Sequence, residues 1–262
     1  MNDVFGDRMK GYEDSGRFDP CLPIIVRADG KSFSRYTRDF DRPWDARMTD
    51  AMCSTTRFLV EQTSARIGYT QSDEITLVLY SDNLKSQVFF DGKKQKIISV
   101  VAAMATAHFN REMRGHFGGT LPDAYFDARA FTVPSKVEAA NALLWRELDA
   151  TRNSVSMLAH HHFHHRALLG ASVPLMKEML AIRGVVWADA PSSFTHGTYY
   201  RREEVLRPFT AEELARIPEA FRPAPETIVA RRTVGRVDVM PDQIAERVAL
   251  IFGDTIPPTT ES

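Results

Sequence analysis

The chain has 262 residues, of which 44% are hydrophobic and 26% charged, and its formal net charge is −1. This composition is that of an ordinary globular protein, so it excludes collagenous, disordered and coiled-coil chains. The near-neutral charge argues against a surface that is basic throughout, although it permits a local basic patch for nucleic acid.

The sequence also predicts the compartment. No run approaches the roughly 18 apolar residues of a membrane-spanning helix, and the charged start MNDVFGDRMKGYED lacks the apolar stretch of a signal peptide. The two cysteines, Cys21 and Cys53, are too few for a disulfide framework and lie outside any CxxC pair. We therefore expect a soluble, cytoplasmic protein with no membrane partner.

The first half of the chain predicts alternating strands and helices. Strands are expected at 23–28, where an apolar, β-branched run ends at Asp29-Gly30, and in two runs separated by a polar tetrapeptide, which predict a hairpin. Apolar residues at helical spacing predict two helices, and one further strand stops at Pro134. The other predicted elements are the helices 43–64 and 93–114 and the strands 66–70, 75–80 and 128–133. This β-α-β-β-α-β order is typical of the ferredoxin-like, polymerase-palm unit.

The second half predicts additional helices and a small C-terminal extension. A long helix is expected at 136–169, and Thr210 and Glu213 form a capping-box pattern that opens a short helix. The remaining expectations are a helix at 174–182, strands at 197–202 and 234–239, a proline-rich connector at 222–227, a helix at 243–252 and a frayed tail at 256–262. We predict an α+β protein with a palm-like catalytic core (1–135) and a helical and mixed extension (136–262) packed on it as one continuous unit.

Carboxylates fall where the predicted sheet would bring them together. The first and third strands of a ferredoxin-like unit are antiparallel neighbours, so Asp29 at the end of one lies beside Asp73 at the start of the other, with Glu74 next to it. Paired carboxylates hold a hard divalent cation whose other ligands are water and substrate phosphates. This arrangement predicts a two-magnesium phosphoryl-transfer site. The alternative, that Asp29-Gly30 and Ser72-Asp73 are merely turns, is not excluded by spacing.

Basic residues flank these carboxylates in the sequence and could bind a triphosphate. They are Arg27, Lys31, Arg42, Lys93, Lys94 and Lys96. The last three open a predicted helix, whose N-terminus also offers free N–H donors to phosphate. An exposed, simply solvated first turn is the alternative.

The histidine run from His160 to His165 has two interpretations. Histidines four residues apart on a helix can share a metal, but no cysteine is near and Glu147 and Asp149 lie about three turns earlier. A partly solvated helix face in contact with RNA is the favoured interpretation. Trp145, Trp187 and Phe194 are predicted to be core residues.

Four ordered motifs resemble those of the tRNA(His) guanylyltransferase family. They are Val-Arg-Ala-Asp-Gly-Lys-Ser-Phe (26–33), Gly-Tyr-Thr-Gln-Ser-Asp-Glu (68–74), Phe-Asp-Ala-Arg (126–129) and Trp-Arg-x-x-Asp-x-x-x-Asn (145–153). The similarity extends from Gly6 to about Pro241. It implies an enzyme that adds nucleotides to tRNA in the 3′-to-5′ direction, with two Mg²⁺ ions as cofactors and GTP, ATP or other nucleoside triphosphates as substrates. It also implies a homo-oligomer, commonly a tetramer.

The resemblance implies roles for individual residues. Asp29, the Gly30 carbonyl and Asp73 would bind the metal ions, and Glu74 would support them as a third catalytic carboxylate. The implied nucleotide-binding residues are Arg27, Asp29, Gly30, Lys31, Ser32, Phe33, Ser34, Arg42, Ser72, Asp73, Lys93 and Lys96. Arg27 and Lys96 among them would contact the triphosphate, and Arg42 stands where the family usually has lysine. Candidate contacts to tRNA or a second nucleotide are Arg129, Arg152 and Asn153.

One motif departs from the eukaryotic pattern. Where eukaryotic members have His-Ile-Asn-Asn, this chain has Thr151-Arg152-Asn153-Ser154 and keeps only the first asparagine. This departure resembles the bacterial and archaeal-type members, which tend to repair tRNA 5′ ends by copying the opposite strand. We therefore expect template-dependent addition, with untemplated G addition to tRNA(His) as an alternative.

Two other classes of function compete with this prediction. A nucleotide cyclase could use the same palm and carboxylate pair, but the similarity along nearly the whole chain argues against it. A non-catalytic RNA-binding sheet would expose aromatic residues on its strands, whereas the residues of 23–28 are predicted to be buried.

Overall fold

The computed structural model describes residues 4–13, 15–82 and 87–253, so the predicted tail at 256–262 lies outside it. Within these ranges one antiparallel sheet has the strand order β4-β1-β3-β2-β5-β6. The strands are β1 (Ile24–Gly30), β2 (Ile67–Gln71), β3 (Glu74–Leu79), β4 (Phe126–Thr132), β5 (Thr198–Pro208) and β6 (Ile228–Val237).

The helices complete the predicted unit. They are α1 (Val4–Lys10), α2 (Phe33–Tyr36), α3 (Ala46–Thr63), α4 (Lys94–Phe117), α5 (Lys136–His162), α6 (Val173–Ile182), α7 (Ser192–Thr195), α8 (Ala211–Ala215) and α9 (Ile244–Phe252). The order β1-α3-β2-β3-α4-β4 and the inner strand order β4-β1-β3-β2 are those of a ferredoxin-like palm. The α+β prediction is confirmed. No helix in the described ranges is both long and apolar enough to cross a membrane.

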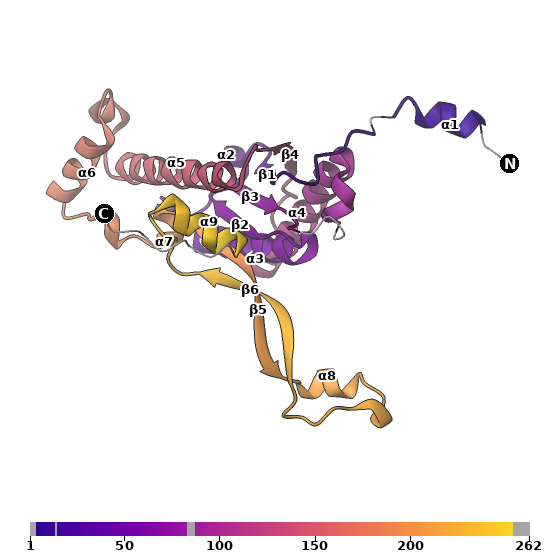
Figure 1. Ribbon diagram of the computed structural model, residues 1–262. Coiled ribbons are helices and arrows are strands. Elements are labelled where there is room, and N and C mark those ends of the chain that lie inside the picture. The colour runs from indigo at the N-terminus through magenta and orange to yellow at the C-terminus, as the bar shows by residue number, and fades with distance from the viewer. Residues whose placement is uncertain (1–3, 14, 83–86, 254–262) are drawn as a thin grey trace, which may run out of the picture.

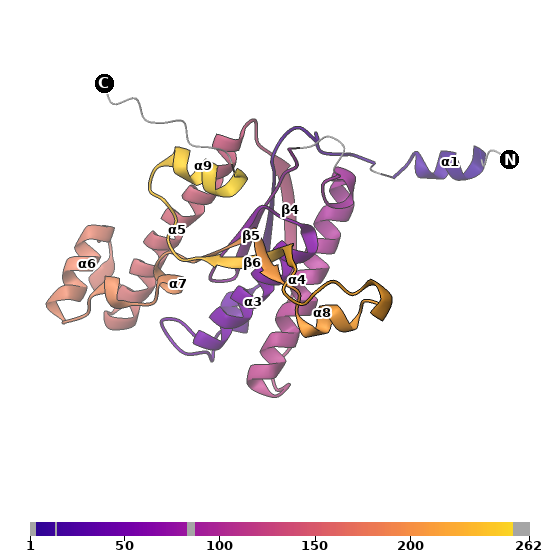
Figure 2. The same cartoon turned by 60° about the horizontal axis from the view of Figure 1, so that its bottom comes forward.

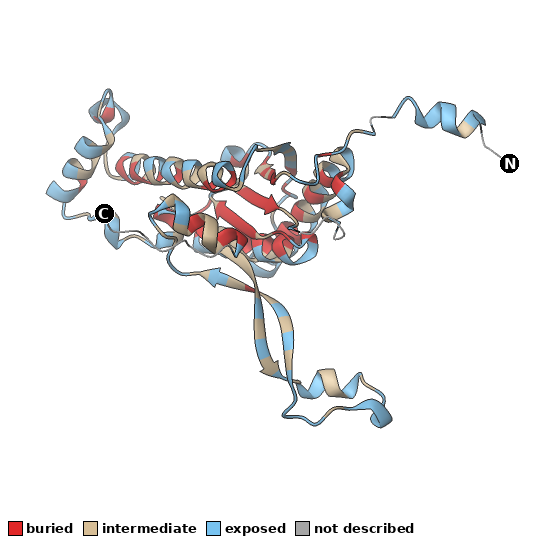
Figure 3. Cartoon of the chain, viewed as in Figure 1, coloured by how far each residue is buried: buried red, intermediate tan, exposed pale blue. Residues whose placement is uncertain are grey.

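Helices cover both faces of the sheet (Figure 2). Alternate side chains of a strand point to opposite faces, so Ile24 and Val26 of β1 pack in one cluster with α3 and α4, whereas Ile25 packs in another with α5 and α9. Figure 3 shows the resulting buried residues on the central strands. Asp29 has the same parity as Ile25, so it lies on the α5 face.

Helix α5 ends earlier than predicted. The expected helix extended to 169, but Phe163 adopts an extended backbone (φ −132°, ψ 145°) that stops α5 at His162, and His165–Leu168 form a single 3₁₀ turn. Trp145 was predicted to be core and is 53% exposed, because it lies two residues from the inward-facing Leu143 and so projects from the opposite side of α5. Phe194 is buried as predicted, at 6% exposure, and Trp187 is half-buried.

Strands β5 and β6 are longer than the predicted 197–202 and 234–239. Beyond the sheet they continue as a two-stranded arm (residues 203–233) that leaves the body, with α8 near its end (Figure 1). The connector predicted at 222–227 lies within this arm. The capping box of α8 is present, with Glu213 N donating to Thr210 Oγ1 (3.2 Å) and Thr210 N donating to Glu213 Oε2 (2.9 Å).

Candidate active site

The turn between β2 and β3 brings Asp73 to the end of β1. The β1–β3 register places Asp29 opposite Glu74, and the Gly30 N–H donates to the Asp73 carbonyl (3.0 Å). The turn has only two residues between the paired Gln71 and Glu74, and Ser72 adopts the left-handed conformation (φ 55°) that so tight a reversal requires. The sheet topology therefore gathers the predicted carboxylates at one edge.

The Asp73 carboxylate is electrostatically disfavoured. Burial raises its pKa above the usual value, the Ser72 hydroxyl (Oγ to Oδ1, 3.0 Å) partly offsets this, and the negative charges of Asp29 and Glu74 raise the pKa further. A divalent cation between Asp29 and Asp73 would remove this repulsion, so the donor set fits Mg²⁺. In the part of the chain that the structure describes, no group of three or more His, Cys, Asp or Glu side chains is arranged to hold a metal. Magnesium here would complete its shell with the Gly30 carbonyl, water and substrate phosphates, which is its usual habit.

Gly30 is required by close packing beneath the site. A Cβ at this position would lie 2.2 Å from Phe33 Cδ2. The Phe33 ring is 4% exposed and packs against Tyr36, Phe109 and Phe126. Phe33, predicted to line the nucleotide, also lines the larger hollow at the carboxylates, so it both supports Gly30 and borders the candidate site.

Two adjoining hollows open at the carboxylates and share Gln71, Ser72, Asp73 and Met157. The first, of about 340 Å³, is lined by Asp29, Glu74 and Arg146 among others. The second, of about 470 Å³, is lined by Ser32, Ser34 and Arg42 together with apolar side chains such as Trp44 and Phe194. The structure thus brings Ser32, Ser34, Arg42 and Ser72 together with Asp73, as predicted from the resemblance. Lys31, which is exposed, lines neither hollow.

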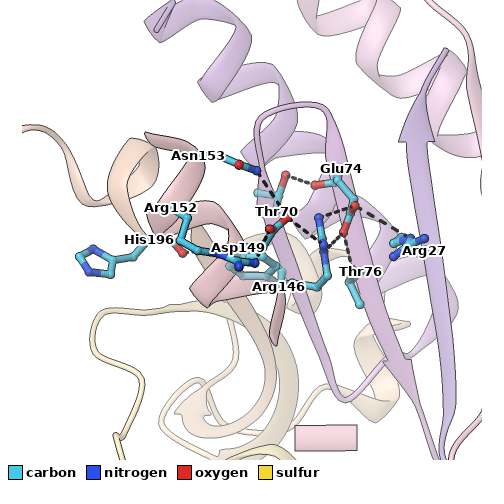
Figure 4. A network of polar contacts seen from close by, with 10 residues as sticks. Arg27, Thr70, Glu74, Thr76, Arg146, Asp149, Arg152, Asn153 and His196 are labelled. Atoms are coloured by element: carbon cyan, nitrogen blue, oxygen red, sulfur yellow. Dashed lines mark hydrogen bonds and ion pairs between the residues drawn. The ribbon is translucent and has the colours of Figure 1, made fainter. Parts of the chain in front are cut away.

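Glu74 is held by an arginine rather than left free (Figure 4). Arg146 of α5 donates from Nε to Glu74 Oε1 (2.6 Å) and from Nη2 to Glu74 Oε2 (2.8 Å). Arg27 Nε lies 3.9 Å from Glu74 Oε2, and Thr76 Oγ1 donates to Glu74 Oε1 (3.3 Å). Because both carboxylate oxygens are engaged within the protein, Glu74 acts by fixing the edge of β3 against α5. Arg27, predicted to contact triphosphate, points into this network.

Asp149 extends the network along α5. It accepts from Arg146 Nη1 (3.1 Å), Arg152 Nη2 (2.7 Å) and Asn153 Nδ2 (3.4 Å). Asn153 lines the smaller hollow, whereas Arg152 is largely exposed. Arg129 of β4 lies opposite Arg27 and pairs with Asp127 (3.1 Å). Sequence reasoning did not assign Arg146 and Asp149 to the site, although both lie in the 145–153 motif.

Lys93 and Lys96 do not reach the site, which corrects the prediction. Strand β3 runs away from Asp73, so α4 begins at the far end of the sheet and returns toward the carboxylates. Its Thr106 Oγ1 accepts from the N–H of Phe126, the strand partner of Gly30 (3.0 Å). Lys96 precedes Thr106 by ten residues, or about 15 Å along the helix. Lys93 and Lys94 lie at the start of the same helix and are still farther from the carboxylates.

The histidine run lies at the end of α5. His160 and His161 line a hollow of about 340 Å³ that shares Arg42, Pro43 and Met157 with the larger hollow at the carboxylates. The His160 ring stacks on His165 at 5.6 Å. The metal interpretation finds no three-ligand group among the described residues.

Comparisons with known proteins agree with this geometry. The tRNAHis guanylyltransferase family profile matches residues 6–134. A bacterial tRNA(His) guanylyltransferase-like protein in complex with ATP is 37% identical (TM-score 0.72), the match covering 76% of this chain and 88% of that one. A structure of such a protein in complex with GTP is 30% identical (TM-score 0.72), covering 95% and 100%. The tRNA(His) guanylyltransferase of Schizosaccharomyces pombe is 30% identical over 153 residues, so the chain spans about half (56%) of that relative.

The palm-like sheet, the paired carboxylates and the nucleotide-bound relatives define the class of protein. The chain is a nucleotidyltransferase. It belongs to the tRNA(His) guanylyltransferase family, since the chain covers 88% and 100% of the two bacterial structures at 37% and 30% identity.

Proposed function

We propose that this protein adds nucleotides in the 3′-to-5′ direction to the 5′ end of a tRNA, choosing each base by pairing with the opposite strand. The observation that carries the proposal is the juxtaposition of Asp29 and Asp73, whose hollow adjoins the one lined by Ser32, Ser34 and Arg42. Such a site suits a triphosphate whose phosphates lie at the carboxylate edge. The ATP and GTP in the two bacterial relatives support this choice of substrate.

The residues divide the work of binding and orientation. Asp29, the Gly30 carbonyl and Asp73 would hold two Mg²⁺ ions, which neutralise phosphate charge and lower the pKa of a bound hydroxyl. Arg42 supplies positive charge, and the first turn of α2 offers N–H groups to phosphate. Arg146 fixes Glu74 so that its charge stays off the reacting phosphates. The reaction needs no side-chain nucleophile, because the 3′-hydroxyl of the incoming nucleotide attacks the activated 5′ phosphate of the RNA. With a 5′ triphosphate, the bond to the leaving pyrophosphate breaks. A 5′ monophosphate first displaces pyrophosphate from a nucleoside triphosphate to form a 5′-5′ linkage, and the attack then expels the nucleoside monophosphate. In both cases the proton of the attacking hydroxyl passes to solvent.

The position of Ser154 supports template dependence. Ser154 stands where eukaryotic members have the second asparagine, and it is fully buried. Its hydroxyl donates to the Thr151 carbonyl (2.9 Å) and accepts from Trp187 Nε1 (3.0 Å). A side chain used in this way is not available to hold an unpaired RNA end. Base pairing would then be the main means of selecting the incoming nucleotide.

The test is extension of tRNAs that lack the first 5′ nucleotide, with each of the four opposing bases and each nucleoside triphosphate supplied separately. We expect the complementary nucleotide to be added at least tenfold faster than G opposite a non-complementary base, a difference of about 1.4 kcal/mol in barrier. GTP without RNA serves as the control for cyclase activity, and Asp29→Asn as the inactive control. Preferential G addition to full-length tRNA(His), whatever the opposing base, would refute the proposal.

A further inference from the structure

A further hollow lies at the end of the sheet opposite Asp29 and Asp73. Its volume is about 410 Å³, and it is lined by three arginines, Arg66, Arg202 and Arg232, and by one carboxylate, that of Asp82. The other lining residues are Thr63, Ser64, Leu79, Tyr80, Ser81, Gln87, Val88 and Phe89. Strand β3 separates Glu74 from Leu79, so this hollow lies about one six-residue strand, or ~20 Å, from the carboxylates. No part of the reaction proposed above uses it.

The sheet itself forces the arginines together. Arg66 directly precedes β2, and the Arg202 N–H donates to the Arg66 carbonyl (3.2 Å), which makes the two residues neighbours on adjacent strands. Arg202 lies opposite Val234 on β6, and Arg232 has the same parity as Val234. All three side chains therefore project from the same face of the sheet, the one that α3 and α4 cover, and they lie beside the C-terminal end of α3. Like charges at adjoining strand positions are destabilising.

Two of the three arginines have no counter-charge among the residues that the structure describes. Arg66 donates to the Tyr80 carbonyl (Nε, 3.1 Å) and pairs with Asp82. Across the described ranges, the guanidinium groups of Arg202 and Arg232 make no hydrogen bond or ion pair, and Glu204, the strand partner of Arg232, lies outside ion-pair distance. Burial and the positive charges of Arg66 and Arg232 lower the pKa of Arg202.

Two other arginines of the arm, in contrast, have a carboxylate partner. Arg207 and Arg231 both pair with Glu213, at 2.8 Å and 2.7 Å. Arg66 and Arg202 are half-buried, and Arg232 is exposed. Neutralising the charges of Arg202 and Arg232 from outside requires an anion, and the planar guanidinium fork fits phosphate oxygens in particular.

We propose that Arg66, Arg202 and Arg232 form a phosphate-binding site remote from the catalytic carboxylates. The phosphate belongs either to the backbone of the bound RNA or to a free nucleotide or pyrophosphate. The RNA alternative rests on the proposed function, whereas the site itself does not.

The test compares wild type with the double variant R202Q/R232Q, which removes the two unpaired charges and keeps Arg66 with Asp82. The matched control is R216Q/R222Q, which removes two exposed charges near the far end of the arm. Binding of inorganic pyrophosphate without Mg²⁺ is measured by calorimetry, and binding of an intact tRNA by fluorescence anisotropy at several salt concentrations. Because Asp29 and Asp73 are unchanged in all three proteins, a difference reports the remote hollow.

We expect R202Q/R232Q to bind at least one probe tenfold or more weakly than both wild type and control, and to melt no lower than wild type when no ligand is present. Weaker tRNA binding with a reduced salt dependence assigns the site to the RNA backbone. Weaker pyrophosphate binding with unchanged tRNA binding assigns it to a free phosphate compound. Equal binding of both probes by all three proteins would overturn the site, and tRNA extension by wild type would leave the proposed function standing.

Discussion

The ion pair between Arg146 and Glu74 gives the sharpest energetic prediction. The two side chains are 17% and 16% exposed and share two short hydrogen bonds, at 2.6 and 2.8 Å. Removing one partner of a mostly buried pair costs about 3 to 5 kcal/mol, because the other charge is left without compensation. Thr76 and Arg27 still contact Glu74, so we take the lower end for Arg146→Ala, about 3 kcal/mol. For a chain of this size that corresponds to a fall of about 6 to 12 °C in Tm.

A double-mutant cycle isolates the pair. In a Glu74→Gln background the loss of Arg146 affects only one carboxylate, that of Asp149, which keeps its contacts with Arg152 and Asn153. Arg146→Ala should then cost about 1 kcal/mol, and the coupling energy should be about 2 kcal/mol. Arg146→Lys should be intermediate, because an ammonium group cannot form the two-pronged contact. Urea unfolding of the four proteins of the cycle measures the coupling. Additive effects, within about 0.5 kcal/mol, would show that the fork does not hold β3 to α5.

Three further predictions concern single side chains. Asp73→Asn should abolish nucleotide addition yet raise Tm at pH 7. Because the pKa of Asp73 is raised in the folded protein, the wild type should melt below the variant only as pH rises above the usual carboxyl pKa, and the two Tm values should converge below it. Mg²⁺ should raise the Tm of the wild type alone. Asp45, whose pKa is lowered to about 2, caps α3 and pairs with Arg47, so Asp45→Ala should lower the free energy of unfolding by about 2 kcal/mol at pH 7. Thermal melts should show this difference between wild type and variant disappearing as pH falls from about 4 toward 2. Lys96→Ala should leave the KM for nucleoside triphosphate within twofold of wild type in steady-state assays, because α4 begins at the far end of the sheet; a tenfold rise would contradict that placement.

The palm was predictable because its signals are local. The runs around Gln71-Glu74 are short, apolar and separated by polar residues, and such a pattern fixes both a hairpin and its register. Once the strand order is known, Asp29 and Asp73 must meet. The direction of the chain would also have predicted that Lys96 lies at the end of the sheet far from Asp29 and Asp73, since a helix that follows β3 starts where β3 stops.

Other features depended on contacts between distant residues. Nothing around Arg146 indicates that Glu74, 72 residues earlier, is its partner. The outer part of β5 was missed because both faces of the arm are largely solvated, which removes the apolar alternation that marks a strand. Trp145 looked like a core residue by type, but its place on α5 depends on which face of that helix meets the sheet.

The two-residue turn at Ser72-Asp73 has a consequence for how activity can be lost. Strands β2 and β3 are buried on both faces, and their side chains pack in two different clusters, which locks them in register. An extra residue inserted here would therefore be absorbed as a longer loop and would displace only Asp73. Such a chain would keep its sheet and its core, and would express and melt like its parent, yet it would lack one of the two carboxylates that are paired at this edge of the sheet. In this fold a single insertion is enough to turn an enzyme into a stable, inert copy of itself.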